Sequence, residues 1–529
     1  MAQHPPNTGP SDPSGPQYLI RLAHAHETFR VPELESLASL LGITLSIVDY
    51  KPTSPFCVVR FNATSTSVDQ PSQDELAKTF ISHSILSKSI YELYATGTTY
   101  DDLHDNVKSL PASTWAPYKN VSFKFNIDAF CGSRTMAQQR DIVEGFGYLP
   151  FEGRIKLKNP DVEFVVGEEW ELLTPEEHSL LNTGAGVQQR NPSVDGNGNG
   201  HADTNTAEKV AAILSERKPR RLFFGRFIGE SRRDLIIKHD LKKRPYISTT
   251  SMDAELALVT ASLAKAGLGG LFLDPFTGTG GFMVAAAELG AIVLGADIDG
   301  RSFRGKSKGL EKGVGANFRR YGLEGVLGDC LTADLTNSPF RLPGKPKKDS
   351  SRWLDGIICD PPYGVREGLK VLGRRVHGPD GMNGKATHEG PYFIDGVPSH
   401  LLPGFVAPKR PYSFNRMLDD IMDFAVRSLV DGARLAFWMP CANDADEEFP
   451  VPRHNMLELK HSCIQVFNKW SRRLLVYERV AGDVPEDMVN GVQDLSLDST
   501  SGHKADELNQ FRRMYFRGFA EETPKNDHG

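Results

Sequence analysis

Four short apolar segments in the second half of the chain each lead to an aspartate, a pattern typical of parallel β-strands that end at one edge of a sheet. The four aspartates are Asp274, Asp297, Asp329 and Asp360. Open parallel sheets bind ligands outside the carboxyl ends of their strands, so these side chains are expected to gather there. Any one of them alone could instead cap a helix. Together they predict a doubly wound α/β domain with a ligand site at this edge.

A glycine-rich turn follows the first of these segments, Leu271–Asp274, and precedes an apolar helix. Its glycines let backbone N–H groups approach a ligand, and the helix directs its positive end at the same place. The spacing Gly-Thr-Gly-Gly differs from the G-x-G-x-x-G of dinucleotide sites and favours S-adenosylmethionine as the cofactor. Asp297, rather than Asp299, would bind the ribose hydroxyls, and Asp329 the adenine amine. The candidate cofactor-binding residues from this pattern are Asp274, Thr277, Gly278, Gly280, Asp297 and Asp329.

The last aspartate opens the signature Asp360-Pro361-Pro362-Tyr363. An amine attached to a planar ring is a poor nucleophile because its lone pair is delocalised. A carboxylate and a backbone carbonyl that accept its two N–H groups favour the pyramidal, attacking form, and Pro362 has no N–H to compete for that carbonyl. Asp360, the carbonyl of Pro361, Pro362 and a stacking Tyr363 are therefore the candidate catalytic residues. A strand that ends in an ordinary Asp-Pro turn is the alternative.

Two segments rich in Lys and Arg suggest contacts with a polyanion, although the net charge of the chain is -6. Residues 216–244 hold eleven Lys or Arg and four acidic residues, and residues 365–410 form a second basic stretch rich in Gly and Pro. Both could bind phosphates, or be a solvated linker and a disordered insertion respectively. The candidate residues for nucleic-acid binding are Arg226, Arg232, Arg233, Lys242, Lys243, Arg244 and Arg366.

Cysteine usage and hydropathy indicate a soluble intracellular protein. The six cysteines show no C-x-x-C spacing, so no metal site is predicted. No apolar run reaches 18 residues, and the N-terminus lacks the apolar core of a signal peptide, so we expect no membrane association and a cytoplasmic location.

The length of 529 residues predicts several domains. We expect a disordered tail (1–16), an α+β domain (17–110), a second folded region (111–181), a flexible insertion (182–215), a basic linker (216–248), an α/β domain (249–482, with a long loop at 365–410) and a C-terminal extension (483–529). Hydrophobic periodicity predicts, among other elements, a helix from Pro32 to Leu41, a strand from Gly153 to Leu157, a helix from Ser413 to Leu429 and a terminal antiparallel strand pair at 462–467 and 474–479.

Several stretches resemble known families. Phe123–Phe130, the helix 138–146 and residues 151–161 resemble a THUMP domain, an RNA-binding module of RNA-modifying enzymes. Residues 224–256, together with 360–364, resemble the catalytic subunits of eukaryotic tRNA (guanine-10-N2)-methyltransferases, and the similarity spans most of 18–480. It implies a Rossmann-like class I methyltransferase domain, preceded by an α+β region with a THUMP domain.

The resemblance also implies activity, cofactor and partners. It predicts methyl transfer from S-adenosylmethionine to the 2-amino group of guanosine 10 in tRNA, with Thr250 and Ser251 near the methionine end of the cofactor. A helix cap explains these two residues equally well. The family works with a small zinc-binding activator subunit, which would form a heterodimer with this chain.

Other readings of the same signature are an adenine-N6 DNA methyltransferase or a methyltransferase of protein glutamine side chains. The THUMP-like region argues against both. A different guanosine of tRNA or rRNA is a nearer alternative, and an RNA-binding protein with a relic catalytic domain is a further one.

Overall fold

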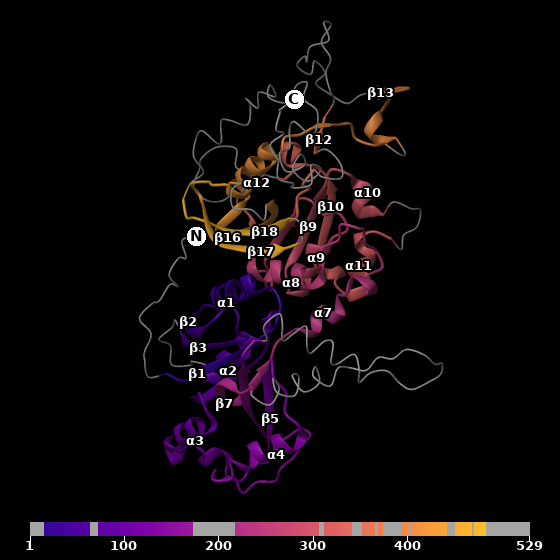
Figure 1. Cartoon of the computed structure of the whole chain (residues 1–529). Helices are drawn as coiled ribbons and strands as arrows, with labels where there is room; N and C mark the ends of the chain where they lie inside the picture. The colour runs from indigo at the N-terminus through magenta and orange to yellow at the C-terminus, as the bar shows by residue number, and fades with distance from the viewer. Residues whose placement is uncertain are drawn as a thin grey trace, which may run out of the picture. The chain divides into compact units, whose positions relative to one another are not determined.

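The protein, examined as a computed structural model, divides into two compact units that each combine segments distant in sequence (Figure 1). The first unit comprises 1–24, 43–83 and 87–231, and the second comprises 25–42, 84–86 and 232–529. The structure describes residues 15–63, 72–172, 217–305, 312–340, 352–364, 369–373, 393–402, 405–441, 450–467 and 470–482. The expected insertion at 182–215, the extension at 483–529, nearly all of the tail at 1–16 and most of the loop at 365–410, including Arg366, lie outside these residues.

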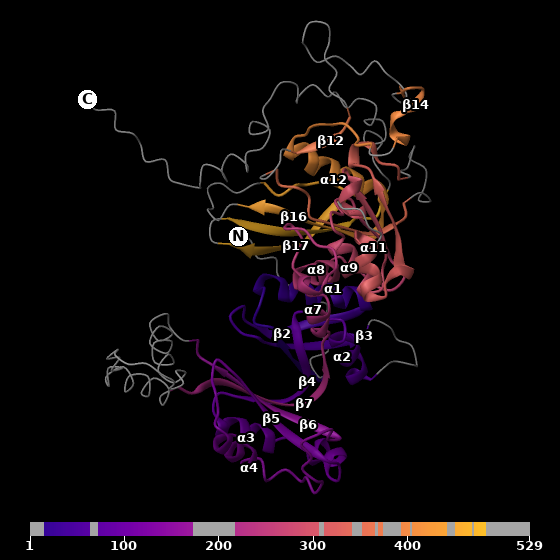
Figure 2. The ribbon, with the colours of Figure 1, turned by 90° about the vertical axis from the view of Figure 1, so that its right-hand side faces the viewer.

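The first unit is built on one seven-stranded sheet in the order β2-β3-β1-β4-β7-β6-β5 (Figures 1 and 2). Its strands are β1 (Gln17–Leu22), β2 (Ile43–Tyr50), β3 (Phe56–Ala63), β4 (Ser87–Gly97), β5 (Phe123–Phe130), β6 (Val162–Trp170) and β7 (Pro219–Glu230), with helices α2 (Gln73–Ile81), α3 (Tyr100–Lys108) and α4 (Met136–Glu144). Because the sheet runs through both 17–110 and 111–181, the expected boundary at residue 110 falls inside one folded unit.

Strand β7 corrects the expectation of a linker at 216–248. It lies between β4 and β6 in the sheet and is antiparallel to both. Its apolar side chains pack on opposite faces of the sheet. Leu222 and Phe224 belong to one hydrophobic cluster and Phe223 belongs to another. The predicted strand at 153–157 is also wrong, because Ile155 makes only an isolated bridge to Phe123.

The second unit holds a seven-stranded sheet in the order β10-β9-β8-β11-β16-β18-β17. The first five strands in this order are parallel, and the pairs β16·β18 and β17·β18 are antiparallel. The Rossmann-like expectation and its terminal antiparallel pair are therefore confirmed. The strands are β8 (Leu271–Asp274), β9 (Ile292–Asp297), β10 (Leu327–Thr332), β11 (Leu354–Cys359), β16 (Leu429–Cys441), β17 (Leu457–Val466) and β18 (Ser471–Arg479).

Helices cover both faces of this sheet, as a doubly wound fold requires. Alternate residues of β8 face opposite clusters, with Phe272 on the side of helices α8 (Ala254–Leu263) and α9 (Gly281–Glu288) and Leu273 on the side of α12 (Phe414–Ser428). Helix α11 (Val314–Tyr321) contributes Val314 and Phe318 to the first cluster. Each cluster buries large apolar side chains, which supplies most of the stabilisation of such a unit.

Helix α1 (Glu27–Leu41) belongs to this second unit although it is encoded near the N-terminus. Phe29 is fully buried and stacks on Trp438 of β16, with ring centroids 5.8 Å apart. Thr28 exchanges two 3.0 Å hydrogen bonds with the backbone of Ile464 on β17. The helix thus packs against the edge strand β17 of the sheet.

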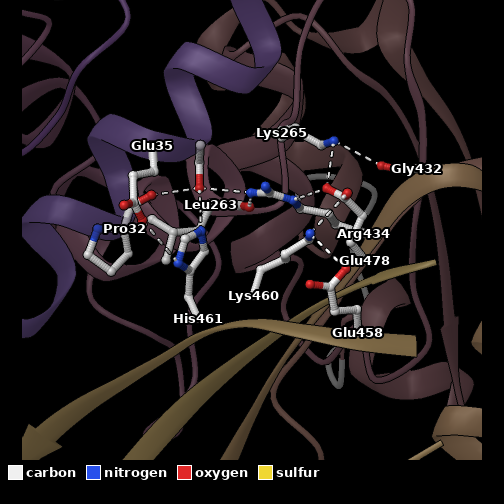
Figure 3. Close-up of polar contacts among 11 residues, drawn as sticks. Pro32, Glu35, Leu263, Lys265, Gly432, Arg434, Glu458, Lys460, His461 and Glu478 are labelled. Carbon is white, nitrogen blue, oxygen red and sulfur yellow. Dashed lines mark hydrogen bonds and ion pairs between the residues drawn. The ribbon is translucent and has the colours of Figure 1, made fainter. Parts of the chain in front are cut away.

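A polar network secures the same helix (Figure 3). Arg434, which is 4% exposed, donates hydrogen bonds of 2.8 Å to Ser36 Oγ on α1 and to the carbonyl of Leu263, and it pairs with Glu478 at 3.1 Å. Burial lowers the pKa of His461 to about 3, so its ring is neutral at pH 7 where it contacts Ser36.

The segment 84–86 also joins the second unit, through Glu33 of α1. The buried carboxylate of Glu33 accepts hydrogen bonds from Ser84 Oγ (2.7 Å), Ile85 N (2.7 Å) and Leu86 N (3.0 Å). Burial raises the pKa of Glu33 to about 7.

Candidate active site

A cavity of about 400 Å³ lies in the second unit, where the parallel strands end. Pockets of this size hold small molecules and cofactors. Nine candidate residues line it: Thr250, Ser251, Thr277, Gly278, Asp297, Asp360, Pro361, Pro362 and Tyr363. The glycine turn and the Asp-Pro-Pro-Tyr signature, which are far apart in sequence, therefore open into one cavity.

The glycine turn has the geometry that its sequence predicts. Gly278 (φ +52°) and Gly280 (φ +76°) adopt the left-handed region, and Gly280 caps the N-terminus of α9. A Cβ on Gly280 would lie 2.9 Å from the methyl groups of Val314, so this position requires glycine. Asp297 accepts hydrogen bonds from Gly278 N (2.9 Å) and Asp299 N (2.8 Å), one on each carboxylate oxygen. Each oxygen keeps a second lone pair that a hydroxyl of a ligand can use.

Asp299 has a different role from Asp297. Its carboxylate caps helix α10 (Gly300–Arg304), pairs with Arg301 at 2.6 Å, and these contacts hold the pKa of Asp299 well below its usual range. Asp297 lines the cavity, which agrees with the preference for Asp297 as the ribose-binding candidate.

Asp274 and Gly280 are not among the residues that line the cavity. They act on the conformation of the glycine turn instead. The Asp274 carboxylate is 3% exposed and accepts a 3.0 Å hydrogen bond from Phe276 N. Burial raises the pKa of Asp274 well above its usual value. Its expected part in cofactor binding is therefore indirect, through the conformation of the turn.

The segment before α8 forms another wall, with Ser248, Thr250 and Ser251 lining the cavity. Asp253 is the N-cap of α8, and its side chain accepts hydrogen bonds from Glu255 N and Leu256 N. The alternative of a helix cap at Thr250 or Ser251 is therefore wrong. Ser251 instead bonds the glycine turn, because its Oγ lies 2.8 Å from Thr279 Oγ1.

The catalytic signature follows β11. Tyr363 donates a 2.6 Å hydrogen bond from its hydroxyl to Asp360 Oδ1, and Arg472 Nη1 lies 3.9 Å from Asp360 Oδ2. Burial raises the pKa of Asp360, and the bond from Tyr363 and the charge of Arg472 act in the opposite direction. The carboxylate is 24% exposed, so one side of it remains open to the cavity that it lines.

The expectation that Asp329 follows the end of its strand and binds the adenine amine is wrong. Strand β10 does not end at Gly328 but continues to Thr332, so Asp329 lies within the strand, where it is exposed and does not line the cavity. The carboxylate that reaches the cavity from this strand is Asp334, just beyond its end. The apolar run stops early because β10 is an edge strand with little burial.

A further wall of the cavity, which the sequence did not predict, follows the catalytic signature. Part of the stretch expected as an irregular loop forms a two-stranded sheet of β12 (Lys370–Leu372) and β15 (Lys409–Pro411). Asp334 accepts a hydrogen bond from Leu372 N, and Lys409 lies 3.6 Å from Asp299. The cavity-lining residues on and beside this sheet are Leu369, Lys370, Val371, Tyr412 and Met417.

Three of the seven candidate RNA-binding residues form ion pairs within their own unit. Arg226 pairs with Asp74 and Glu92 in the first unit. In the second unit, Arg232 pairs with Glu288 and Arg233 with Glu255. The net positive charge of the sequence segment is thus largely neutralised by acids from elsewhere in the chain.

The remaining candidates among the described residues differ in how exposed their side chains are. Arg244 is 5% exposed beside Gly281, so the expectation that it contacts phosphates directly is wrong for the structure as it stands. Lys242 and Lys243 are exposed, and Lys243 donates to the carbonyl of Ile237 at 2.6 Å.

Two further observations apply to the described part of the chain. It contains no cluster of three or more His, Cys, Asp or Glu side chains suited to a metal ion. None of its helices combines the length and the apolar character needed to cross a bilayer.

Comparison with known proteins places the chain among relatives of similar length. Residues 16–181 match the family model of the Tmrp11 THUMP N-terminal domain. The chain is 37% identical over 506 residues to the tRNA (guanine(10)-N(2))-methyltransferase of Saccharomyces cerevisiae, which covers 95% of this chain and 99% of that protein. The enzyme of the same name from Schizosaccharomyces pombe is 31% identical over 529 residues, or 94% of this chain and 96% of that protein. Among solved structures, TrmN from Thermus thermophilus covers 88% of this chain and 100% of that chain, at 17% identity and a TM-score of 0.34.

Proposed function

Because the chain belongs to the tRNA (guanine(10)-N(2))-methyltransferase family, we propose that it transfers the methyl group of S-adenosylmethionine to the 2-amino group of guanosine 10 in tRNA. The observation that supports this most is that the Asp360-Pro361-Pro362-Tyr363 turn and the glycine turn line the same cavity. A cofactor site and an amine-holding site thus face one space.

The residues around the cavity fit the cofactor. S-adenosylmethionine, when bound, supplies a methyl group made electrophilic by its sulfonium. Asp297 would accept the ribose hydroxyls, the backbone of the turn at Thr277 and Gly278 would contact the cofactor closely, and Thr250 and Ser251 would lie near its methionine end. Asp334 replaces Asp329 as the carboxylate for the adenine amine, since it is the one that lines the cavity.

The catalytic turn would hold the target amine. Asp360 accepts one N–H of the guanine 2-amino group and the carbonyl of Pro361 accepts the other, which favours the pyramidal nitrogen that attacks. The guanine leaves its stack in the RNA to reach the cavity, at a cost of a few kcal/mol. Tyr363 stacks on the base, with its ring restrained by the hydrogen bond to Asp360.

Substitution of Asp360 tests this role. Asp360→Ala should lower methyl transfer to unmodified tRNA by at least about 100-fold, because the amine loses its main acceptor. Affinity for S-adenosylmethionine, measured by calorimetry, should stay close to that of the wild type. Near-normal turnover by the variant would contradict the role of Asp360.

The substrate is tested separately with the full-length wild-type chain. Methyl transfer should occur to an unmodified tRNA transcript and not to DNA or to a Gly-Gly-Gln protein, and nucleoside mapping should place N2-methylguanosine at position 10. A tRNA with adenosine at position 10 is the matched control. Modification at another nucleotide, or of the control, would overturn the proposed substrate.

Partners and location complete the proposal. A small zinc-binding activator would form a heterodimer with this chain in the cytoplasm, and exposed Lys242 and Lys243 would contact tRNA phosphates. Purification of the tagged chain from its own cells should recover the activator in equal amount, whereas isolation of an active single chain would contradict the heterodimer.

A further inference from the structure

The strand register places Arg472 beside the catalytic turn. Asp360 directly follows β11, which is parallel to β16, so both strands end at the same edge of the sheet. Strand β18 runs back along β16 and pairs Arg472 with Pro440, near the end of β16. A basic side chain from the last strand of the sheet thereby reaches a carboxylate that lies more than a hundred residues earlier in the chain.

Arg472 and Tyr363 each interact with a different oxygen of the Asp360 carboxylate. The hydroxyl of Tyr363 bonds Oδ1 at 2.6 Å, and Arg472 Nη1 lies 3.9 Å from Oδ2. Arg472 is 16% exposed, so solvent screens this charge pair only in part. The arrangement fixes the carboxylate from two sides.

The guanidinium of Arg472 is itself held in place. Its Nε donates a 2.6 Å hydrogen bond to Gln465 Oε1, and its Cζ lies 4.6 Å from the ring centroid of Trp438 and 5.5 Å from that of Phe467. Cation–π contacts of this kind orient an arginine without neutralising its charge. The charge therefore remains available to Asp360.

A nearby positive charge helps to keep the buried carboxyl of Asp360 ionised. Burial favours the protonated form of the Asp360 carboxyl, and Asp274 at the end of β8 is a second buried carboxyl whose own pKa is raised. The other ionisable groups that face Asp360 among the described residues are Cys359, Tyr363 and Arg472. Arg472 is the only cation in this set. A protonated Asp360 would carry a proton on one oxygen and so lose part of the acceptor capacity that the target amine needs.

We propose that Arg472 is a positioning residue that keeps the carboxylate of Asp360 ionised and oriented toward the target amine. This role rests on the function proposed above. A purely structural alternative is that Arg472 only stabilises the β17–β18 hairpin through its aromatic contacts. The two differ in the pH dependence that they predict.

The test compares Arg472→Gln and Arg472→Lys with Arg473→Gln in the full-length enzyme, purified with any subunit that it needs for activity. Arg473 is the matched control, because it is the next residue of β18 and its side chain, 9% exposed, lies on the other face with Tyr477. The rate of methyl transfer is measured from about pH 5.5 to about pH 9, where an ionisation needed for catalysis appears as an acid limb.

Arg472→Gln should shift the midpoint of the acid limb upward by about one pH unit, because an opposite charge at this distance lowers a carboxyl pKa by that order. Arg472→Lys should shift it less, Arg473→Gln should not shift it, and cofactor affinity should be unchanged in all three. A loss by the same factor at every pH, or equal effects of Gln and Lys, would overturn the proposal. A wild type that methylates a different nucleotide would refute the proposed substrate only, since the pH comparison can be made on that nucleotide.

Discussion

At the scale of single residues, Gly280 is constrained both by its backbone conformation and by the packing around it. Its left-handed backbone starts α9 beside the cavity, and Val314 occupies the space where a side chain would begin. The first constraint comes from the glycine turn and the second from α11, so a substitution at Gly280 should affect binding and folding together.

Gly280→Ala should lower the free energy of unfolding by at least about 2 kcal/mol, the sum of left-handed strain and overpacking. Gly322→Ala is the control, since Gly322 has a similar φ of +70° but nothing within 4 Å, and should lose only about 1 kcal/mol. Urea denaturation measures both. Cofactor affinity should fall in the Gly280 variant alone. Equal losses of unfolding free energy in the two variants would show that Val314 can move aside at no cost in stability.

Site residues could be predicted from the sequence where the signal is local. Asp274, Asp297 and Asp360 lie at strand ends because strongly apolar strands stop there. The prediction for Asp329 was wrong because an edge strand needs little apolar sequence and β10 continues through polar residues. Arg472 could not be predicted, because its position beside Asp360 depends on the pairing of strands distant in the sequence.

At the scale of elements, α1 shows how tertiary contacts move a boundary. Proline is common in the first turn of a helix, which favoured a start at Pro32. The helix begins at Glu27 instead, because Thr28 and Phe29 are held by β17 and Trp438. The segment of β7 was expected as a linker for a related reason, since a central strand of mixed composition is recognised by its neighbours rather than by its own pattern.

Glu33 on α1 should make the stability of the second unit depend on pH. Burial raises its pKa in the folded state to about 7, above the unfolded value of 4.5. The contribution of Glu33 is therefore fully present below about pH 4.5 and is lost as the pH rises through about 7. The difference in unfolding free energy between wild type and Glu33→Gln should fall by up to about 3 kcal/mol across this range.

Denaturant titrations of the two proteins at several pH values measure this difference. Comparison with the uncharged variant removes the contribution of the other titrating groups. A difference that stays constant with pH would mean that the hydrogen bonds from Ser84, Ile85 and Leu86 offset the effect of burial.

At the scale of the whole molecule, the catalytic unit is not a continuous stretch of sequence. A chain that begins at Arg232 contains every strand of the second sheet but lacks α1 and residues 84–86. It would expose the surface that Phe29 covers and leave buried Arg434 without Ser36. No pattern in the sequence indicated this, because most of the first unit lies in the sequence between α1 and its partners on β16 and β17.

We expect the fragment 232–529 to aggregate or to unfold at a clearly lower temperature than the second unit of the full-length chain, because it loses core contacts and a satisfied buried charge. Coexpression with residues 25–42 on a soluble carrier should restore part of this stability. Thermal unfolding followed by circular dichroism compares the three. A fragment as stable as the intact protein would show that α1 is dispensable for the second unit.

The position of α1 also has a consequence for biosynthesis. Thr28 and its partner Ile464 are 436 residues apart, so the ribosome releases the helix long before the strand that receives it. At ~5–20 residues per second, this interval lasts roughly 20–90 s. During it, the apolar side of α1 has no native partner on β16 or β17, and the nascent chain offers chaperones a defined early binding segment.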